Sequence, residues 1–153
     1  MKPDVERIKA EARRIALALD RKDILAVGLF GSLARGDYHE RSDIDIFVIT
    51  EKELTLAEEH ELYRAFRDLR ALFRKDTTIL VYDLKGVKRV PSWQTLSMIK
   101  DACFLVDRAQ VQELFEKILQ QAAEHGIVFD EREKLFRLTR PGKVVFSYEE
   151  PPR

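Results

Sequence analysis

Two aspartates lie one residue apart at the start of an apolar run, in the stretch "SDIDIFVIT" of residues 42–50. If this run is a strand, Asp43 and Asp45 point to the same face, roughly 7 Å apart along the backbone, because side chains alternate with a period of two. Like charges on one face repel unless a cation compensates them, and Mg²⁺ accepts carboxylate ligands. The pair therefore predicts a divalent metal site. The alternative is that Asp43 caps a turn and Asp45 lies on an exposed strand face.

A glycine and a serine precede this pair, directly after the apolar run "ILAVGLF" of residues 24–30. Gly31 and Ser32 would then lie at a strand-to-helix turn, where unpaired backbone N–H groups bind phosphate oxygens and glycine permits close approach. We predict one or two helical turns over residues 32–37, entered through Ser32 as the N-cap. The ten residues between Ser32 and Asp43 suffice for this helix and a return loop. A phosphate site and the carboxylate pair would therefore face each other.

Hydrophobic periodicity supplies the elements that would position these residues. It predicts an amphipathic helix over residues 5–19 and a long helix that starts at the capping-box pair Thr55 and Glu58 and reaches about residue 75. A third strand is predicted over residues 77–84, ended by Gly86. Strands that alternate with helices favour a sheet with helices packed against it.

The region after Pro91 is predicted to begin with a helix. The short run at residues 102–107 fits either a fourth strand or a continuation of that helix. Asp107 is predicted to cap a further helix, which Gly126 closes. The remaining expectations are a short helix after Asp130, a turn at residues 140–142 and a strand-like segment over residues 143–148.

The 153 residues predict a single domain, with a core over residues 1–90 and an extension over residues 91–153. The 27 basic and 27 acidic side chains cancel, which argues against a broad positive field for nucleic acid. One cysteine and the lack of a signal or membrane-span pattern predict a cytoplasmic protein. A basic cluster near the C-terminus could hold phosphate, RNA or an acidic partner, or could be a solvated charged face: Arg132, Lys134, Arg137, Arg140 and Lys143.

The pattern of Gly-Ser, ten residues and then Asp-Ile-Asp resembles the signature of the DNA polymerase beta-like nucleotidyltransferase superfamily. "GSLARGDYHERSDIDIFVI" most resembles its minimal nucleotidyltransferases, some of which are antitoxins paired with HEPN-domain toxins. The resemblance implies an α+β fold with a small mixed β-sheet in an α-β-α-β-α-β core, helices packed on it and a helical C-terminal extension. It also implies that Gly31 and Ser32 contact a nucleoside triphosphate, and that Asp43 and Asp45 hold Mg²⁺ in a two-metal reaction.

Arg35, on the predicted short helix, is a candidate for offsetting phosphate charge, because its fork of donors matches phosphate oxygens. The alternative is that Arg35 is a surface residue paired with Asp37 or Glu40.

The resembling family also uses a third carboxylate on the third strand. When "TTILVYDLKGV" is aligned on Tyr82, Thr78 occupies the position of that carboxylate. Asp76 lies two residues earlier on the same face and is the candidate third catalytic acid, whereas Asp83 has the opposite parity. Without a third acid, the metal loses a ligand, so activity could be weak while nucleotide binding persists.

Together with these residues, the resemblance implies a Mg²⁺-dependent nucleotidyltransferase that passes a nucleoside monophosphate, AMP from ATP, to a hydroxyl acceptor such as a HEPN-like toxin partner. The departure at Thr78 also favours a second reading, in which the chain is a catalytically weak or inactive nucleotide-binding, antitoxin-like module. RNA or a small molecule is a third choice of acceptor, and the neutral overall charge counts against RNA. The sequence leaves a homo-oligomer open.

Overall fold

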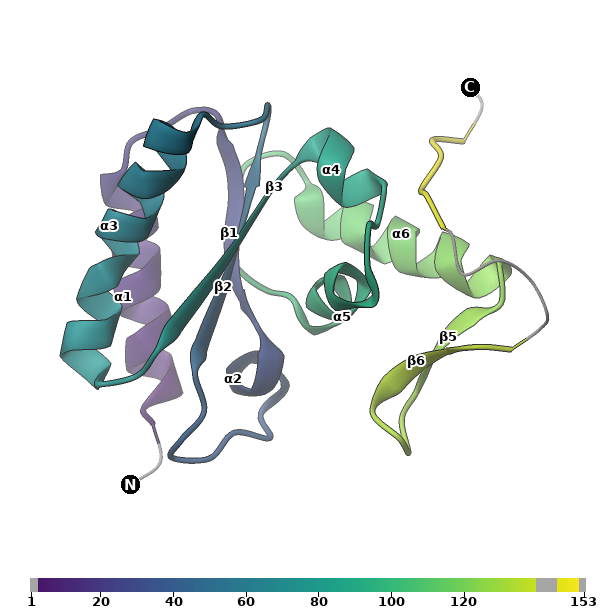
Figure 1. Cartoon of the computed structure of the whole chain (residues 1–153), viewed down its shortest axis with the longest axis horizontal. Helices are drawn as coiled ribbons and strands as arrows, with labels where there is room; N and C mark the ends of the chain where they lie inside the picture. Colours follow the sequence, from purple (N-terminus) through teal and green to yellow (C-terminus); the bar gives the residue numbers. More distant parts are fainter. Residues whose placement is uncertain (1–2, 140–145, 152–153) are drawn as a thin grey trace.

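Helices cover both faces of a four-stranded mixed sheet in the computed structural model, which describes residues 3–139 and 146–151 (Figure 1). The elements in chain order are α1 (Val5–Ala18), β1 (Ile24–Phe30), α2 (Gly31–Arg35), β2 (Ile44–Thr50), α3 (Leu56–Phe73), β3 (Thr77–Asp83), α4 (Leu84–Lys88), α5 (Trp93–Asp101), β4 (Cys103–Asp107), α6 (Val111–Glu124), β5 (Ile127–Asp130) and β6 (Leu135–Leu138). The α+β class with a mixed sheet is confirmed. No helix of the described residues is long and apolar enough to cross a membrane.

The strand order is β3-β2-β1-β4, so the two strands that carry the candidate site lie in the middle of the sheet. Strand β1 is antiparallel to β2 and to β4, and β2 is parallel to β3. This register places Asp45 of β2 between Phe30 of β1 and Thr78 of β3. Because β1 and β2 are antiparallel, the end of β1 lies beside the start of β2, and the residues at both places can form one site.

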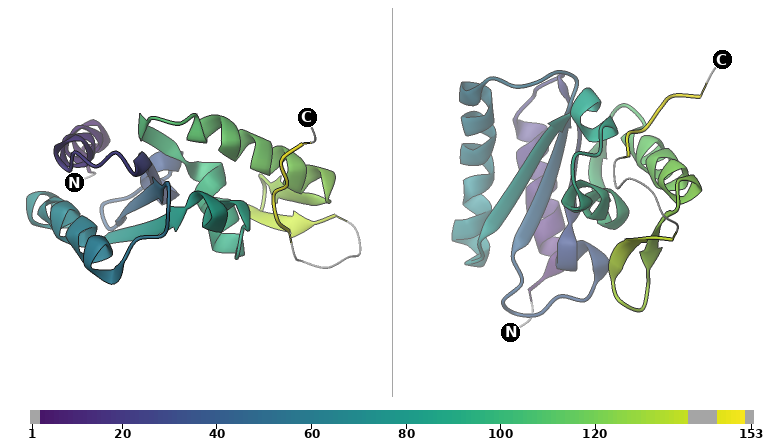
Figure 2. Two further views of the ribbon diagram at one scale, coloured as in Figure 1. Left: turned by 90° about the horizontal axis from the view of Figure 1, so that it is seen from above. Right: turned by 45° about the vertical axis from the view of Figure 1, so that its right-hand side comes forward.

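The two faces of the sheet hold separate cores. Helices α1 and α3 cover one face and α4 to α6 cover the other, as the view from above shows (Figure 2). On β2, Ile44, Ile46 and Val48 join the core under α1 and α3, whereas Phe47 and Ile49 join the second core. Because side chains alternate, Asp45 belongs to the second face.

A close aromatic contact fills the second core. The ring of Phe47 lies 5.1 Å from that of Phe104 and 5.7 Å from that of Phe115, centroid to centroid. Gly28, opposite Phe47 in β1, makes room for it, since a Cβ there would collide with the Phe47 ring and with the carbonyl oxygen of Cys103. Burying such an aromatic cluster contributes several kcal/mol, on the order of 2 or more per ring.

Local signals account for most helix boundaries. The predicted capping box is present: the Thr55 hydroxyl accepts from the Glu58 N–H, and the Glu58 side chain accepts from the Thr55 N–H. Asp107 accepts hydrogen bonds from three backbone N–H groups before and within the start of α6, and Gly126 adopts a left-handed φ of 83° just after its end. The capping box confirms the predicted start of α3. The Asp107 carboxylate does accept from the first N–H groups of α6, but the N-cap position is Gln110 rather than Asp107.

Several expectations were wrong or are resolved by the structure. The short helix α2 begins at Gly31 with Phe30 as its N-cap, so Ser32 lies inside its first turn rather than capping it. The run at residues 102–107 is the strand β4, not a continuation of α5. Gly86 does not end β3 but lies inside α4, where its N–H is held by the Asp83 side chain.

The expected helix after Asp130 is also wrong. The Asp130 side chain accepts from the N–H groups of Arg132 and Glu133, which looks like a helix cap in sequence, but the chain turns there and pairs as the hairpin of β5 and β6. The turn predicted at residues 140–142 lies outside the described residues, as does half of the strand-like segment over residues 143–148. Residues 146–151 are described and have no regular secondary structure.

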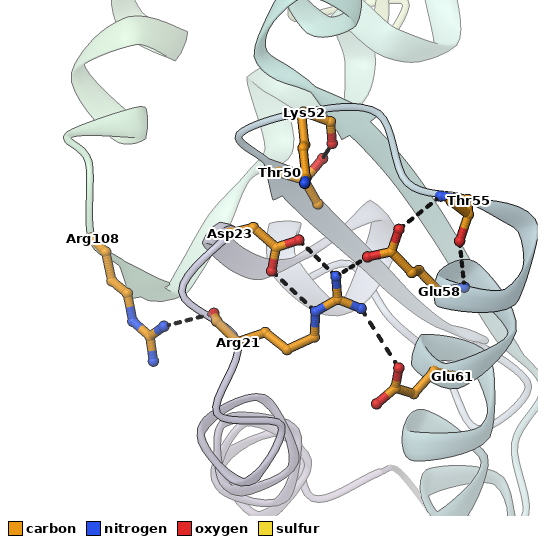
Figure 3. Close-up of polar contacts among 8 residues, drawn as sticks. All are labelled: Arg21, Asp23, Thr50, Lys52, Thr55, Glu58, Glu61 and Arg108. Atoms are coloured by element: carbon orange, nitrogen blue, oxygen red, sulfur yellow. Dashed lines mark hydrogen bonds and ion pairs between the residues drawn. The ribbon is translucent and has the colours of Figure 1, made fainter.

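An arginine network joins three loops at the end of the sheet far from the candidate site (Figure 3). The Arg21 guanidinium, which is largely buried, donates from Nη2 to Asp23 Oδ2 at 2.6 Å and forms an ion pair with Glu58 of α3. A longer contact of 3.6 Å reaches Glu61, and Arg108 donates to the Arg21 carbonyl at 3.1 Å. The Arg21 side chain thus links the start of β1 to the first turns of α3, and its backbone carbonyl, through Arg108, adds the end of β4.

Removing this link should cost stability. We expect Arg21→Met to lower the free energy of unfolding by about 2 kcal/mol, because it leaves Asp23 and Glu58 partly buried without their cation. Urea denaturation followed by circular dichroism measures this. The matched control is Arg14→Met, which breaks an exposed pair with Glu11 on α1 and should change stability by less than about 0.5 kcal/mol. Equal losses in both variants would contradict the assignment.

Candidate active site

The turn from β1 into α2 brings the backbone against a carboxylate. Gly31 has a φ of 73°, in the left-handed region that favours glycine. A Cβ at this position would collide with Oδ2 of Asp45. No side chain caps the first turn of α2. The Asp45 carboxylate therefore lies against the Gly31 turn. The roles predicted for them, metal binding and phosphate binding, stay predictions.

Asp45 is partly buried in the middle of the sheet, and its charge is poorly compensated. Its pKa is raised from 3.8 to about 6, chiefly by burial and then by the negative charge of Asp43. A hydrogen bond with the Thr78 side chain and the charge of Arg35 act in the opposite direction. The ionised form of Asp45 is unfavourable because the group is partly buried and lies near the charge of Asp43. A bound cation would compensate both charges.

Asp43 is exposed and lies one residue before β2, on a loop that the chain holds in place. Lys75 donates from Nζ to the carbonyl oxygens of Glu40 at 2.6 Å and Ser42 at 2.9 Å. The buried Ser42 hydroxyl accepts from the His39 N–H at 2.9 Å. The residues before Asp43 are thereby fixed, although Lys75 itself was not predicted as part of the site. A contact across 33 residues leaves no signal in local sequence.

Arg35 lies at the end of α2 and is held from two sides. Its Nη1 is 2.7 Å from Asp101 Oδ2 at the end of α5, and its Nε is 3.2 Å from Asp37 Oδ2. The pairing with Asp37 matches the surface alternative, whereas the pairing with the nearly buried Asp101 was not predicted. Arg35 nevertheless remains close enough to Asp45 for its charge to act on that carboxyl group.

Arg35 also lines a cavity of about 260 Å³ between α2, α5 and the β5–β6 hairpin. The other lining residues combine charged and aromatic side chains: Ala34, Lys100, Asp101, Phe129, Glu131 and Lys134. Lys100 lies over the Phe129 ring, with 4.8 Å between Nζ and the ring centroid. A polar space with one aromatic side chain in its wall, that of Phe129, therefore lies beside the end of α2.

The structure does not bring the proposed third acid to the pair. Asp76 is exposed just before β3, and its Oδ1 lies 3.6 Å from Nε of Arg70 on α3. Thr78 is the residue opposite Asp45, as the sequence alignment indicated. Within residues 3–139 and 146–151, no three His, Cys, Asp or Glu side chains are gathered so that they could hold a metal ion. Asp43 and Asp45 are thus a pair rather than a triad.

This donor set still fits Mg²⁺ when a nucleotide supplies the rest. Mg²⁺ is usually held by one or two carboxylates together with substrate phosphates and water, not by an all-protein cage. Asp43 and Asp45 provide the two carboxylates, and the adjoining turn at Gly31 is where a phosphate could approach the backbone. Asp43 and Asp45 are therefore better suited to a Mg²⁺ ion that also binds the phosphates of a nucleotide than to an ion bound by the protein alone.

Comparison with known proteins identifies the family. The sequence profile described as "Polymerase beta, Nucleotidyltransferase" matches residues 14–90, half of the chain, which include both aspartates and the Gly31 turn. The chain belongs to this family. The matched segment runs from α1 to the end of α4, so it holds β1, β2 and β3, while β4 comes from the region beyond it.

A curated relative in this family is named "Putative protein adenylyltransferase MJ0141" and comes from Methanocaldococcus jannaschii. It is 38% identical over 60 residues, which are 39% of this chain and 60% of the relative. The match thus spans less than two thirds of the relative's length. The match supports membership of the family, and the activity in the relative's name is a statement about that protein.

Two solved structures share the fold. One is a toxin–antitoxin crystal structure with AMP-PNP, which has a TM-score of 0.52 and 20% identity and covers 76% of this chain and 91% of its own. The other is a mutant toxin–antitoxin MntA-HpeT, with a TM-score of 0.51, 18% identity and the same coverage. At these identities the likeness shows the nucleotidyltransferase fold alone, over 76% of this chain.

The C-terminal basic cluster is dispersed rather than gathered at the site. Arg137 lies 3.0 Å from Asp130 across the hairpin, and Lys134 lies 3.9 Å from Glu131. Lys134 is the member of the cluster that lines the cavity beside Arg35. Arg140 and Lys143 lie outside the described residues.

Proposed function

We propose that this chain is a Mg²⁺-dependent nucleotidyltransferase that transfers AMP from ATP to a hydroxyl group on a partner protein. The observation that carries the proposal is the Asp45 carboxylate, which lies against the glycine turn at Gly31 with Asp43 beside it. Family membership makes nucleotide transfer the natural use of such a site. The relative named as a protein adenylyltransferase supports ATP as donor and a protein as acceptor.

The chain's own residues have distinct tasks in this proposal. The backbone at Gly31 and Ser32 binds the phosphates closely because no Cβ intervenes at Gly31. Asp43 and Asp45 would hold Mg²⁺, which would stabilise the charge that develops on the phosphate oxygens. Arg35, fixed by Asp37 and Asp101, offsets the remaining negative charge. Lys75 keeps the loop that carries Asp43 in register.

The reaction itself is an in-line displacement. The acceptor oxygen forms a bond to the α-phosphorus while the bond from that phosphorus to the bridging oxygen breaks, so pyrophosphate leaves and the hydroxyl proton passes to solvent. The cavity beside Arg35 has a polar lining and one aromatic side chain, Phe129, and we assign it to the nucleoside or to the acceptor. A HEPN-like toxin is the proposed partner, supported by the fold likeness to toxin–antitoxin structures.

The test uses ATP labelled at either the α- or the γ-phosphate, with Mg²⁺ and the protein encoded by the neighbouring gene. We expect label from the α-position, and none from the γ-position, to become attached to the partner. Asp43→Ala and Asp45→Ala should each reduce transfer about 100-fold or more, because the metal loses a carboxylate. Asp68→Ala, an exposed acid on α3, is the control and should transfer normally. Transfer that survives both site changes would reject the assignment.

A second function is favoured by the residue at position 78. With Thr78 opposite Asp45 and Asp76 paired to Arg70, the site holds two carboxylates, which suits binding of Mg²⁺ and ATP without efficient turnover. Such a chain would act as a nucleotide-dependent antitoxin-like binding module. Isothermal titration calorimetry separates the two: Mg²⁺-dependent ATP binding without pyrophosphate release favours the binding module.

A further inference from the structure

The strand β3 forms an open edge of the sheet. Among the described residues, β2 is the sole neighbour of β3 in the strand order, so half of the backbone N–H and C=O groups of Thr77–Asp83 point away from the sheet. The strand is seven residues long, its pairing with β2 runs without a bulge, and no charged residue or proline occurs before Asp83. Proteins usually protect an edge with short strands, bulges, prolines or charges. This edge has none of these devices along its apolar centre.

The opposite edge of the sheet differs. Strand β4 has five residues, its register with β1 shifts between Val27 and Gly28, and it ends at Asp107, whose carboxylate is used to cap α6. Such a strand is a poor template for further pairing. The contrast singles out β3 as the edge built to accept another strand.

The helix α3 presents a row of side chains beside this edge. Spacings of four, four and three residues place Glu59, Tyr63, Arg67 and Arg70 on one flank of the helix, away from α1. Tyr63, Arg67 and Arg70 line a hollow with Thr77 and Ile79 at the start of β3, and Tyr63 is 40% exposed. Glu59 lines a second hollow with Glu53, Val81 and Asp83 at the end of β3. The start of the edge is thus flanked by Arg67 and Arg70 with one acid, Asp76. Its end is flanked by three acids and two bases: Glu53, Glu59, Asp83, Lys85 and Arg89. Basic side chains are therefore in excess at one end and acidic side chains at the other.

We propose that β3 pairs antiparallel with β3 of a second copy of this chain, which joins the two sheets into one of eight strands. A two-fold axis through Leu80 places Ile79 opposite the second copy's Val81 and Thr78 opposite its Tyr82. The same axis brings Arg67 and Arg70 of each copy to the Glu53 and Glu59 end of the other. Asp76 is then next to the second copy's Leu84 and close to its Lys85, which also lines the second hollow.

This pairing is self-complementary, which is what a two-fold interface requires. The axis runs normal to the sheet, so α3 of each copy meets α3 of the other on one face, while Asp45 faces the opposite side. The inference rests on the edge, the apolar strand and the charges of α3, and it does not depend on the proposed transfer reaction.

The wild type is tested by multi-angle light scattering on a sizing column. We expect a species with the mass of two chains of 17.9 kDa each, which dissociates more readily at high salt. The variants R67E/R70E and E53R/E59R should each be monomeric, with dimerisation weakened about 100-fold, because like charges then face each other at both ends. When the two variants are mixed, opposite charges meet again at both ends, so the mixture should recover the dimer.

Two further measurements separate a charge effect from a folding effect. R13E/R64E changes net charge by the same amount as R67E/R70E at exposed positions on α1 and on the solvent side of α3, and it should remain dimeric. Hydrogen exchange should show that the β3 amides pointing away from β2 are slow in the wild type and fast in the monomeric variants, with β2 amides slow in both. A wild type that is monomeric at every concentration, or a mixture that fails to dimerise, overturns the proposal. In that case the open edge of β3 would be a candidate for pairing with a strand of another protein.

Discussion

Asp45→Asn is expected to produce a protein that is more stable than the wild type at pH 8 and inactive in nucleotide transfer. The carboxyl group ionises with a pKa of about 6 in the folded chain and near 3.8 when exposed. The wild type therefore loses stability as the pH rises from about 4 through 6, because the folded state binds the proton more tightly. Asparagine carries no such charge and can still accept the hydrogen bond from Thr78.

The expected gain in unfolding free energy is about 1–2 kcal/mol at pH 8, and it should shrink towards zero below pH 4. Urea denaturation at a series of pH values measures the difference between the two proteins. Mg²⁺ with ATP should raise the melting temperature of the wild type but not of the Asp45→Asn variant, since the variant lacks one of the two metal ligands. If the variant gains no stability at pH 8, Asp45 is not held in an uncompensated site.

Much of this site could be predicted because its parts are close in sequence. Strand alternation alone put Asp43 and Asp45 on one face, and the apolar run before Gly31 located the turn that the structure places against Asp45. Their meeting also needed β1 and β2 to pair, and consecutive strands joined by a short connection usually do. The approach of Asp45 to the Gly31 turn thus follows from local sequence pattern and from the pairing of two consecutive strands.

The parts that were missed depend on distant residues or on short ambiguous runs. Asp101 reaches Arg35 across 66 residues, and nothing local marks it. The five-residue strand β4 has a pattern that fits a helix as well, and pairing with β1 decides it. At Asp130, the side chain binds two following N–H groups as a helix cap would, yet the hairpin of β5 and β6 prevails through long-range pairing.

Adding a carboxylate on β3 is expected to raise the activity of the chain. Thr78 lies opposite Asp45 and shares a hydrogen bond with it, so Thr78→Asp places a third acid beside the pair. Without metal, we expect the variant to be less stable than the wild type by about 1–2 kcal/mol at pH 8, because three like charges then repel. With saturating Mg²⁺ and ATP, pyrophosphate release should rise about tenfold or more, because the added ligand completes a site for a second ion.

Two matched variants decide whether the third ligand is what limits the reaction. Thr78→Asn alters the same contact with Asp45 without adding charge, so its rate should stay near that of the wild type or fall below it. Asp76→Asn should also leave the rate unchanged, because Asp76 is exposed and paired with Arg70 rather than gathered with Asp43 and Asp45. The opposite pattern, with Asp76→Asn inactive and Thr78→Asp no faster than the wild type, would instead assign the third position to Asp76. It would require the start of β3 to move when nucleotide binds, because only then could that carboxylate leave Arg70 and reach the pair.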